Sequence, residues 1–388
     1  MSAIALAAPT RGTRSWHEPA ILVVVVLALM TMGMIMVYSA SRCVDASVDG
    51  YYFSRHMVFL PVAIGALALA AWLPYGWLNR WYLAVAVLAV AAALLVLVLK
   101  FGEERNGAMR WFSLHAGGMG VSFQPSEFAK LALAIFLAWF FSRAAFEPKE
   151  FVRGFAVPMA VIGAVVALVA KEDFGTGVLI GVVATLLCLI AGCRLRYFLA
   201  MLPFLGAGFW WFVWCVPYRL ERLTSFWNPW QHKDGSGWHT IQSLLAIGQG
   251  GLFGVGLGAG VQKYYVPENA TDFIFAVICE EAGLLGGVLV LGLFALLVWR
   301  GGRIVSRAPE RFGFLLAAGL VLVIGLQAVM NVGVVCGALP AKGIGLPFVS
   351  YGGSGLVMMS VAAGLLASVG RRAGAFDRSP KFKVQSPK

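Results

Sequence analysis

The chain has 388 residues, of which 60% are hydrophobic and only 12% carry a charged side chain. This composition excludes a water-soluble globular domain, because too few polar residues are present to cover a solvated surface. The formal net charge of +12 would suit nucleic-acid binding, but the basic residues are spread over short segments between apolar runs, without a nucleic-acid-binding motif. The sequence therefore predicts an all-α polytopic membrane protein that binds no nucleic acid.

Ten apolar runs are long enough, or nearly so, to cross about 30 Å of hydrocarbon as helices. In chain order they are 20–40, 57–73, 82–99, 127–141, 155–170, 176–192, 197–216, 273–299, 314–335 and 348–369. The fourth run is short, and the segment 239–260 is apolar enough to enter the membrane in part, so the count of about ten could change by one. The first run is too long for the apolar core of a cleaved signal peptide, so we expect an uncleaved first helix.

The basic residues give the expected orientation. With a cytoplasmic N-terminus, 18 of the 30 Lys and Arg residues fall on the cytoplasmic side, a positive-inside pattern that also places the C-terminus there. The expected parts are a cytoplasmic tail (1–19), a transmembrane domain (20–370) and a basic cytoplasmic tail (371–388). One large extracytoplasmic loop, 217–272, joins the seventh and eighth helices. Anionic membrane lipids are the expected partners of the basic segments.

The first polar motif on the expected outer side is Gln124-Pro-Ser-Glu127, followed by Lys130. Pro125 fits the first turn of a helix, where Glu127 would meet the positive end of the helix dipole. Glu127 and Lys130 are three residues apart and therefore share a helix face. The pair either orients helices as a buried ion pair or helps to bind a charged headgroup.

Two further outer motifs interrupt the apolar pattern. Lys171-Glu-Asp-Phe-Gly-Thr176 is a charged hairpin between two expected helices, and a Gly- and Pro-rich segment runs from Leu339 to Gly355. Non-helical backbone at membrane depth requires surrounding protein or a wet cavity. Amides freed in the Gly-Gly-Ser354 turn could bind phosphate oxygens, although an ordinary helix cap is an alternative.

The long loop carries aromatic, basic and glycine-rich segments. Its tryptophans and tyrosines suit the membrane interface, and Arg219 and Arg222 could pair with phosphate. At its end, Asp272 stands where an apolar run begins, with Glu280 and Glu281 further along. Ionised groups at such depth cost several kcal/mol unless paired or hydrated, so these carboxylates are a functional hypothesis. The alternative is a structural role, with the carboxylates paired to lysines or to backbone amides.

Together the motifs resemble those of the SEDS family (shape, elongation, division and sporulation proteins) over residues 20–370. The resemblance rests on Gln124-Pro-Ser-Glu, Thr271-Asp-Phe-Ile-Phe-Ala, Glu280-Glu281 and Pro347-Phe-Val-Ser-Tyr-Gly-Gly-Ser, in this order. Gly256-Leu-Gly with the following Gln262-Lys263 is more similar to the division branch than to the elongation branch.

The chain departs from the family pattern at three places. Lys171-Glu-Asp stands where Gln-Pro-Asp is usual, Ala270 replaces a usual His, and His239 replaces a usual Gln. Asp272 itself matches the pattern.

The resemblance implies a peptidoglycan glycosyltransferase that polymerises lipid II at the outer face of the bacterial cytoplasmic (inner) membrane, during cell-wall synthesis at the division septum. Asp272 would be the general base. Partial burial would raise its pKa and nearby lysines would lower it, so we predict no net direction. The expected substrate-binding residues are Glu127, Lys130, Arg219, Arg222, Lys263, Lys342, Ser350 and Ser354, with Glu280, Glu281 and Gln242 in supporting roles.

The resemblance also implies what the enzyme works with. A divalent cation, Mg²⁺ or Mn²⁺, could help to neutralise the leaving pyrophosphate, and no organic cofactor is expected. The expected protein partners are a class B penicillin-binding protein with a single membrane helix and other division proteins. The alternatives are a lipid II flippase, an elongation-type polymerase and a scaffold without catalytic activity. Transporters bind near the bilayer midplane, whereas the polar motifs here all lie on one side.

Overall fold

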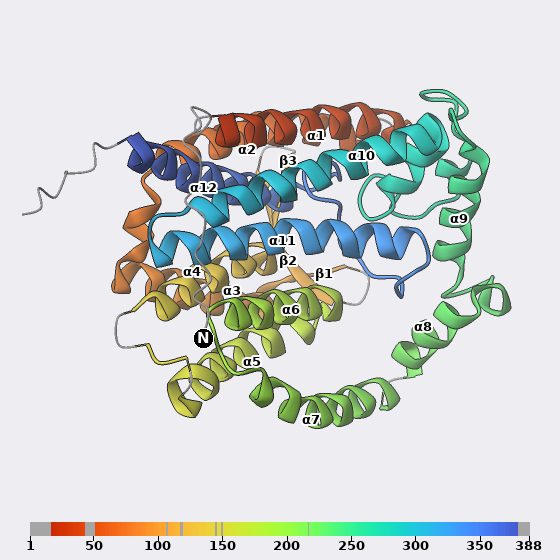
Figure 1. The fold of residues 1–388 in the computed structure, drawn as a ribbon. Helices are drawn as coiled ribbons and strands as arrows, with labels where there is room; N and C mark the ends of the chain where they lie inside the picture. The colour runs from red at the N-terminus through yellow and green to blue at the C-terminus, as the bar shows by residue number, and fades with distance from the viewer. Residues whose placement is uncertain are drawn as a thin grey trace, which may run out of the picture.

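A computed structural model of the chain describes residues 17–42, 51–105, 108–116, 119–143, 146–148, 150–215 and 217–378. Within these ranges long helices lie side by side in one bundle (Figure 1). Most of both expected tails, residues 1–16 and 379–388, lies outside the described residues.

The helices follow the apolar runs of the sequence. They are α1 (His17–Ser41), α2 (Tyr51–Trp72), α3 (Trp81–Phe101), α4 (Pro125–Ser142), α5 (Val157–Ala170), α6 (Phe174–Ile190), α7 (Leu195–Trp214), α8 (Pro217–Trp227), α9 (Trp238–Gly250), α10 (Ile274–Arg307), α11 (Arg311–Val335) and α12 (Gly353–Arg378). A π-helical turn (Val152–Ala156) precedes α5, and short 3₁₀ turns lie at Tyr75–Asn79, Pro229–His232 and Gln262–Tyr264.

Eight helices in the described part of the chain are long and apolar enough to cross a membrane: α1, α2, α3, α4, α5 with its preceding turn, α10, α11 and α12. Two of the ten predicted runs, in α6 and in the Leu195–Gly208 part of α7, form apolar helices that are shorter. The prediction of a polytopic helical membrane protein is therefore confirmed, whereas a full crossing by α6 and α7 stays a prediction.

A small antiparallel sheet lies between α3 and α4, where the sequence pattern indicated only a loop. Its strands are β1 (Glu103–Arg105), β2 (Ala108–Ala116) and β3 (Met119–Phe123), in the order β1-β2-β3. The register places Phe112 opposite Phe123 and Leu114 opposite Val121. Such a short hairpin is stabilised mainly by what packs against it, here α3, α4 and α12. The sheet is an addition to the predicted all-α architecture.

The core of the bundle is formed around α4, α11 and α12. Of the residues in their apolar spans, 83%, 67% and 78% are buried, against 22% for α2 and α3, which therefore contribute fewer residues to the core. α12 packs along α2 and α1, while α11 packs on α4, α6 and α10. The segment between α11 and α12 thus enters the bundle among its most buried helices.

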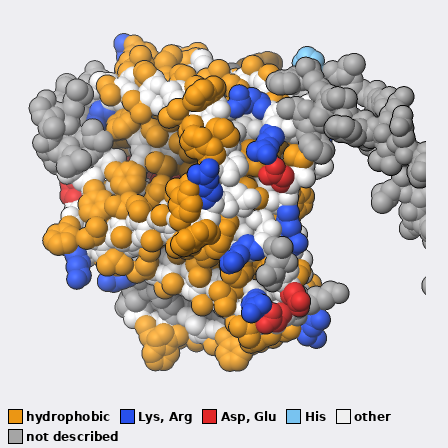
Figure 2. Space-filling model, turned by 90° about the vertical axis from the view of Figure 1, so that its left-hand side faces the viewer, with side chains coloured by type: hydrophobic (Ala, Val, Ile, Leu, Met, Phe, Trp, Pro, Cys, Tyr) orange, Lys and Arg blue, Asp and Glu red, His pale blue; other side chains and the backbone are white. Residues whose placement is uncertain are grey.

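Basic side chains gather at the end of the bundle that lies at the left of Figure 1. Figure 2 shows this end, where Lys and Arg are more frequent than Asp and Glu among hydrophobic side chains. Here the last turns of α10 supply Arg300 and Arg303, whose side chains lie 2.9 Å and 3.0 Å from the buried Glu18 carboxylate at the start of α1. This end agrees with the expected cytoplasmic side.

Candidate active site

Asp272 lies two residues before α10, just outside the membrane-spanning helix, and its side chain is half-buried. A turn holds its backbone: the carbonyl of Glu268 accepts hydrogen bonds from the N–H groups of Thr271, Asp272 and Phe273. Glu268 adopts a left-handed conformation, with φ of 52°, to make this turn. From α11, Asn331 Nδ2 donates to the Asp272 carbonyl at 2.7 Å. The carboxylate is therefore presented from a backbone fixed on two sides.

The segment between α11 and α12 crosses the Asp272 loop. Asn331 Nδ2 also donates to the carbonyl of Ile344 at 2.7 Å, and the Tyr351 N–H donates to the Ala270 carbonyl at 2.8 Å. The Ser350 hydroxyl donates to the Thr271 carbonyl and accepts from the Leu346 N–H. Chain segments about 80 residues apart are thus joined by direct bonds.

Ser350 and Ser354, predicted to bind substrate, are buried and bonded within the protein. Ser354 Oγ accepts from the Gln124 N–H at 3.2 Å, which ties the start of α12 to the start of α4. The two hydroxyls hold segments of the site together, and their contact with the substrate stays a prediction.

The electrostatic surroundings of Asp272 differ from the expectation. Burial, together with the negative charges of Glu268 and Asp173, raises its pKa to about 8, although the Arg110 guanidinium acts to lower it. The prediction of no net direction was wrong because the offsetting cation is one arginine rather than several lysines, and two carboxylates oppose it. Gly343 packs closely against the carboxylate, since a Cβ there would lie 3.1 Å from Asp272 Oδ2.

Arg110, Glu172 and Asp173 are functional candidates that sequence reasoning left out. Arg110 Nε donates to the Glu172 carbonyl at 2.7 Å, and the Glu172 carboxylate accepts from the Met109 N–H at 3.0 Å. These bonds join β2 to the turn before α6. Asp173 caps α6, because its carboxylate accepts from the N–H and the hydroxyl of Thr176. The spacing Asp-Phe-Gly-Thr is an N-cap signal that could have identified Asp173, whereas nothing local points to Arg110.

Lys342 lies half-buried on the same side of the site. Its ammonium nitrogen is 4.8 Å from the centre of the Phe174 ring, within the range of a cation–π contact. Its stem packs against the position of Gly175 at the start of α6. The Lys342 side chain therefore lies against the start of α6, one residue before Gly343.

Glu127 and Lys130 form the buried ion pair that their spacing predicted. Lys130 Nζ lies 2.7 Å from Glu127 Oε1 and donates to Gln327 Oε1 at 2.6 Å. Gln327 in turn donates to the Gly345 carbonyl at 3.0 Å, so the pair is connected to the segment that crosses the Asp272 loop. Among the described residues the other Glu127 oxygen, Oε2, has no hydrogen-bond partner. One lone pair of this carboxylate thus remains available to a polar group in the core.

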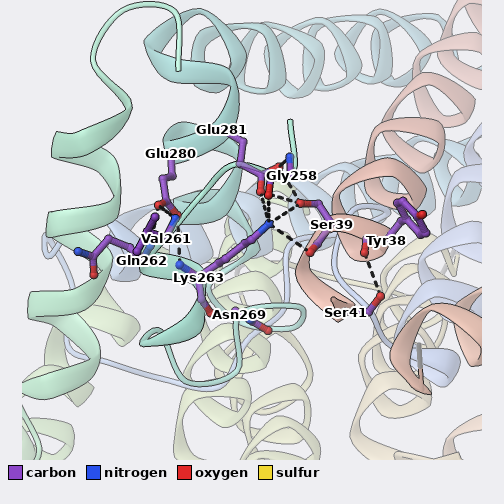
Figure 3. Close-up of polar contacts among 10 residues, drawn as sticks. All are labelled: Tyr38, Ser39, Ser41, Gly258, Val261, Gln262, Lys263, Asn269, Glu280 and Glu281. Carbon is purple, nitrogen blue, oxygen red and sulfur yellow. Dashed lines mark hydrogen bonds and ion pairs between the residues drawn. The ribbon is translucent and has the colours of Figure 1, made fainter. Parts of the chain in front are cut away.

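Lys263 is placed differently from its predicted role. Figure 3 shows its ammonium pointing at the Glu281 carboxylate, 2.7 Å away, in a site where both side chains are almost fully buried. The Glu280 carboxylate accepts backbone N–H bonds from Val261 and Gln262 at 2.6 Å and 2.7 Å (Figure 3). Lys263 is therefore committed to an internal ion pair, and we no longer propose it as a pyrophosphate contact.

The remaining predicted residues lie along the large loop. Gln242 is buried on α9, which packs against α10. Arg219 and Arg222 lie on α8, but their side chains are outside the described residues. Over the described ranges no group of three or more His, Cys, Asp or Glu side chains could hold a metal ion.

Comparison with known proteins identifies the family of the chain. A family model described as "Cell cycle protein" and named for FtsW, RodA and SpoVE matches residues 19–374. Stage V sporulation protein E of Bacillus subtilis is 40% identical over 365 residues, which cover 92% of this chain and 98% of that protein. A probable peptidoglycan glycosyltransferase FtsW of Coxiella burnetii is 39% identical over 367 residues, with the same two coverages.

Solved structures give the same result. A chain in a peptidoglycan synthase complex, described for the coordination of polymerization and crosslinking, superposes with a TM-score of 0.76 at 29% identity, over 91% of this chain and 97% of that chain. The rod shape determining protein RodA of Thermus thermophilus superposes with a TM-score of 0.66 at 29% identity, over 90% and 95%. Fold and site thus define a multi-pass membrane protein of the SEDS type. The chain belongs to the FtsW/RodA/SpoVE family of cell cycle proteins.

Proposed function

We propose that this protein is a peptidoglycan glycosyltransferase that polymerises lipid II at the outer face of the cytoplasmic membrane, with Asp272 as the general base. The observation that carries the proposal is the carboxylate of Asp272 at the edge of a membrane helix, with its pKa raised to about 8 and a cation, Arg110, nearby. Relatives named as probable peptidoglycan glycosyltransferases support the reaction class.

The chemistry requires one base. The 4-hydroxyl of the acceptor GlcNAc attacks C1 of the donor MurNAc, and its proton passes to Asp272 as the bond to the donor's undecaprenyl pyrophosphate breaks. A single displacement inverts the configuration at C1, so a second catalytic carboxylate is not needed. A raised pKa makes Asp272 a stronger proton acceptor than an exposed aspartate.

The leaving pyrophosphate needs positive charge. Arg110 lies near Asp272 and Lys342 directly precedes Gly343, which packs against the Asp272 carboxylate; both supply that charge in our proposal. Arg219 and Arg222 on α8 stay predicted contacts. A divalent cation carried by the pyrophosphate would add to the neutralisation, but the described residues offer it no cluster of ligands, and we propose no step through it.

We further propose that the enzyme acts in septal synthesis with a class B penicillin-binding protein. The glycine and lysine pattern of 256–263 and the high identity to FtsW and SpoVE proteins support the division branch. The structural similarity to a chain in a peptidoglycan synthase complex supports a transpeptidase partner.

The test is lipid II polymerisation by the purified protein with its transpeptidase partner, whose own active site is blocked so that only glycan growth is scored. Wild type is compared with Asp272→Ala and the isosteric Asp272→Asn. Glycan from wild type, and none from either folded, partner-bound variant, is the expected result. Equal glycan from the variants would refute Asp272 as the base. No glycan from wild type, with lipid II crossing liposome membranes instead, would replace the polymerase by the flippase.

A further inference from the structure

α10 is broken at Gly283, where φ is 67° and ψ is −166°, and a loop repairs the break. In a continuous helix the N–H groups of Leu284 and Leu285 would donate to the carbonyls four residues earlier. They donate instead to the glycine-rich loop that follows α9, and loop N–H groups donate to the two freed carbonyls. The Leu284 N–H donates to the Gly251 carbonyl at 2.9 Å, and the Leu285 N–H to the Leu252 carbonyl at 3.3 Å. In return, the Val255 N–H donates to the Glu280 carbonyl at 3.0 Å, and the Gly256 N–H to the Glu281 carbonyl at 3.1 Å.

Glycine is required for this exchange of hydrogen bonds, because the two backbones approach closely. A Cβ at Gly254 would lie 2.1 Å from the Glu281 carbonyl oxygen, and one at Gly250 would lie 1.8 Å from the Cys279 carbonyl oxygen. A Cβ at Gly283 would lie 2.3 Å from the Gly254 nitrogen. The Glu281 carbonyl cannot move away from such a Cβ without losing its bond from the Gly256 N–H. The close packing of the loop against α10 thus explains why glycines stand at these positions.

Charged groups fix the loop beyond the glycines. Glu280 and Glu281, on the short segment of α10 before the break, are 0% and 1% exposed, and Lys263 is 2% exposed. The Glu280 carboxylate accepts the N–H groups of Val261, Gln262 and Lys263, at 2.6, 2.7 and 3.2 Å. The Gly258 N–H donates to Glu281 Oε2 at 3.0 Å, so four backbone amides and one ammonium stabilise the two buried carboxylates.

The same charges reach α1. Lys263 Nζ donates to Glu281 Oε1 at 2.7 Å, to the Gly258 carbonyl at 3.0 Å and to Ser39 Oγ at 3.0 Å, which accounts for its three N–H groups. The Ser39 hydroxyl, at the end of α1, lies 2.6 Å from Glu281 Oε1, to which it donates (Figure 3). The cluster thus joins three elements: α1, α10 and the loop.

Asp272 lies nine residues beyond Lys263, and the chain between them is fixed at both ends. The buried Asn269 side chain donates from Nδ2 to the Lys263 carbonyl at 2.8 Å, which links this segment to the charged cluster. The turn at Glu268 then leads directly to Asp272. A displacement of Lys263 is therefore transmitted to Asp272 through a short, hydrogen-bonded segment.

We propose that Glu280, Glu281, Lys263 and Ser39 form an anchor that positions Asp272 by holding the loop in the break of α10. These are positioning residues, because none of them is among the groups that lie around the Asp272 carboxylate. The consequence for polymerisation rests on the proposed function, whereas the consequence for the loop does not.

The test separates positioning from simple stability by removing the whole ion pair. Replacing one partner of a buried pair leaves an unpaired charge and is strongly destabilising, but replacing both by apolar residues of similar size is often tolerated. The test variant is therefore the double substitution Lys263→Met with Glu281→Met, compared with Lys263→Met alone. The control is Glu18→Gln, which alters a buried carboxylate paired with arginines at the opposite end of α10.

Two readouts are taken from the full-length protein with its partner. The first is hydrogen–deuterium exchange of residues 264–273, and the second is kcat and KM for lipid II polymerisation, with wild type and Asp272→Ala alongside. For the folded double variant we expect exchange in this segment to rise at least about tenfold, and kcat to fall at least about tenfold with KM within about twofold, because a small misplacement of a catalytic group costs rate rather than binding. The control keeps wild-type values in both.

Unchanged exchange of residues 264–273 in the double variant would overturn the anchor, whatever the activity. Raised exchange with wild-type kcat would also overturn it, since the cluster would then hold the loop without positioning Asp272 for the reaction. If wild type makes no glycan, the proposed function fails, and the exchange data by themselves still decide whether the anchor holds the Asp272 segment.

Discussion

The Arg110 guanidinium lowers the pKa of Asp272, and replacing it should move the pH dependence of the reaction. A base with a pKa of about 8 is only about one tenth ionised at pH 7. The rate should therefore rise with pH and level off above the pKa, with an acid limb centred near 8. Arg110 lowers this pKa, so Arg110→Met should shift the acid limb to higher pH.

The size of the shift follows from the geometry. A Cβ at Gly343 would lie 3.1 Å from Asp272 Oδ2 and 3.9 Å from Arg110 Nη1, so the two charges are no more than about 7 Å apart. At that separation Coulomb's law gives about 2.4 kcal/mol at an effective dielectric constant of about 20, and about 0.6 kcal/mol in bulk water. The acid limb should accordingly move up by roughly 0.4 to 1.7 pH units, or about one unit.

The assay is kcat/KM for lipid II polymerisation between pH 6 and 9.5. Arg110→Lys is the matched control, because it keeps the positive charge but loses the Nε bond to the Glu172 carbonyl. It should leave the limb near its wild-type position.

Two groups act in the opposite sense: Glu268 on the Asp272 loop and Asp173 at the start of α6 both raise the pKa of Asp272, so Glu268→Gln should shift the limb to lower pH. An active Arg110→Met variant with an unshifted limb would refute the assignment of that limb to Asp272.

Two further predictions concern the stability of the membrane domain. Lys130→Met leaves Glu127 buried and unpaired, so it should strongly lower the unfolding temperature in detergent, by the equivalent of about 3–5 kcal/mol in unfolding free energy. Adding Glu127→Met should restore much of this stability. A Lys130→Met variant as stable as wild type would contradict a buried, ionised pair. Gly283→Ala should also lower the unfolding temperature, because its Cβ would lie 2.3 Å from the Gly254 nitrogen and the backbone there has a positive φ. Gly292→Ala, on the same helix but with open space around it, should be neutral or slightly stabilising. Equal unfolding temperatures for the two alanine variants would argue against a loop inserted at Gly283.

The repaired break in α10 bears on how a membrane protein can hold an extracytoplasmic loop in place. Backbone groups freed inside a membrane helix must find partners, because lipid offers none. Here the loop that leads to Asp272 supplies them, and its own amides are satisfied by the Glu280 carboxylate. The polar groups that would otherwise be costly at this depth therefore hold the loop against α10.

The sequence alone was sufficient for the helices and for several site residues. Apolar runs are local, since a span must be continuous to cross hydrocarbon, and so the helix positions could be read from one stretch of chain at a time. The same holds for Glu127 and Lys130, whose pairing follows from three-residue spacing on one helix. Asp272 could be singled out because a carboxylate at the edge of an apolar run is costly wherever the run packs.

Only the tertiary structure decided which distant groups face one another. Arg110 on β2 and Asp173 at the start of α6 approach Asp272 because α3, α4, α6 and α11 bring their ends together, and no local pattern encodes that juxtaposition. Lys263 was assigned to the substrate from its charge and its place in a loop, yet packing buries it against Glu281. The physical reason is that hydrophobic burial fixes each helix through its own residues, whereas the pairing of buried charges depends on which loops the packed helices bring within a few ångströms of one another.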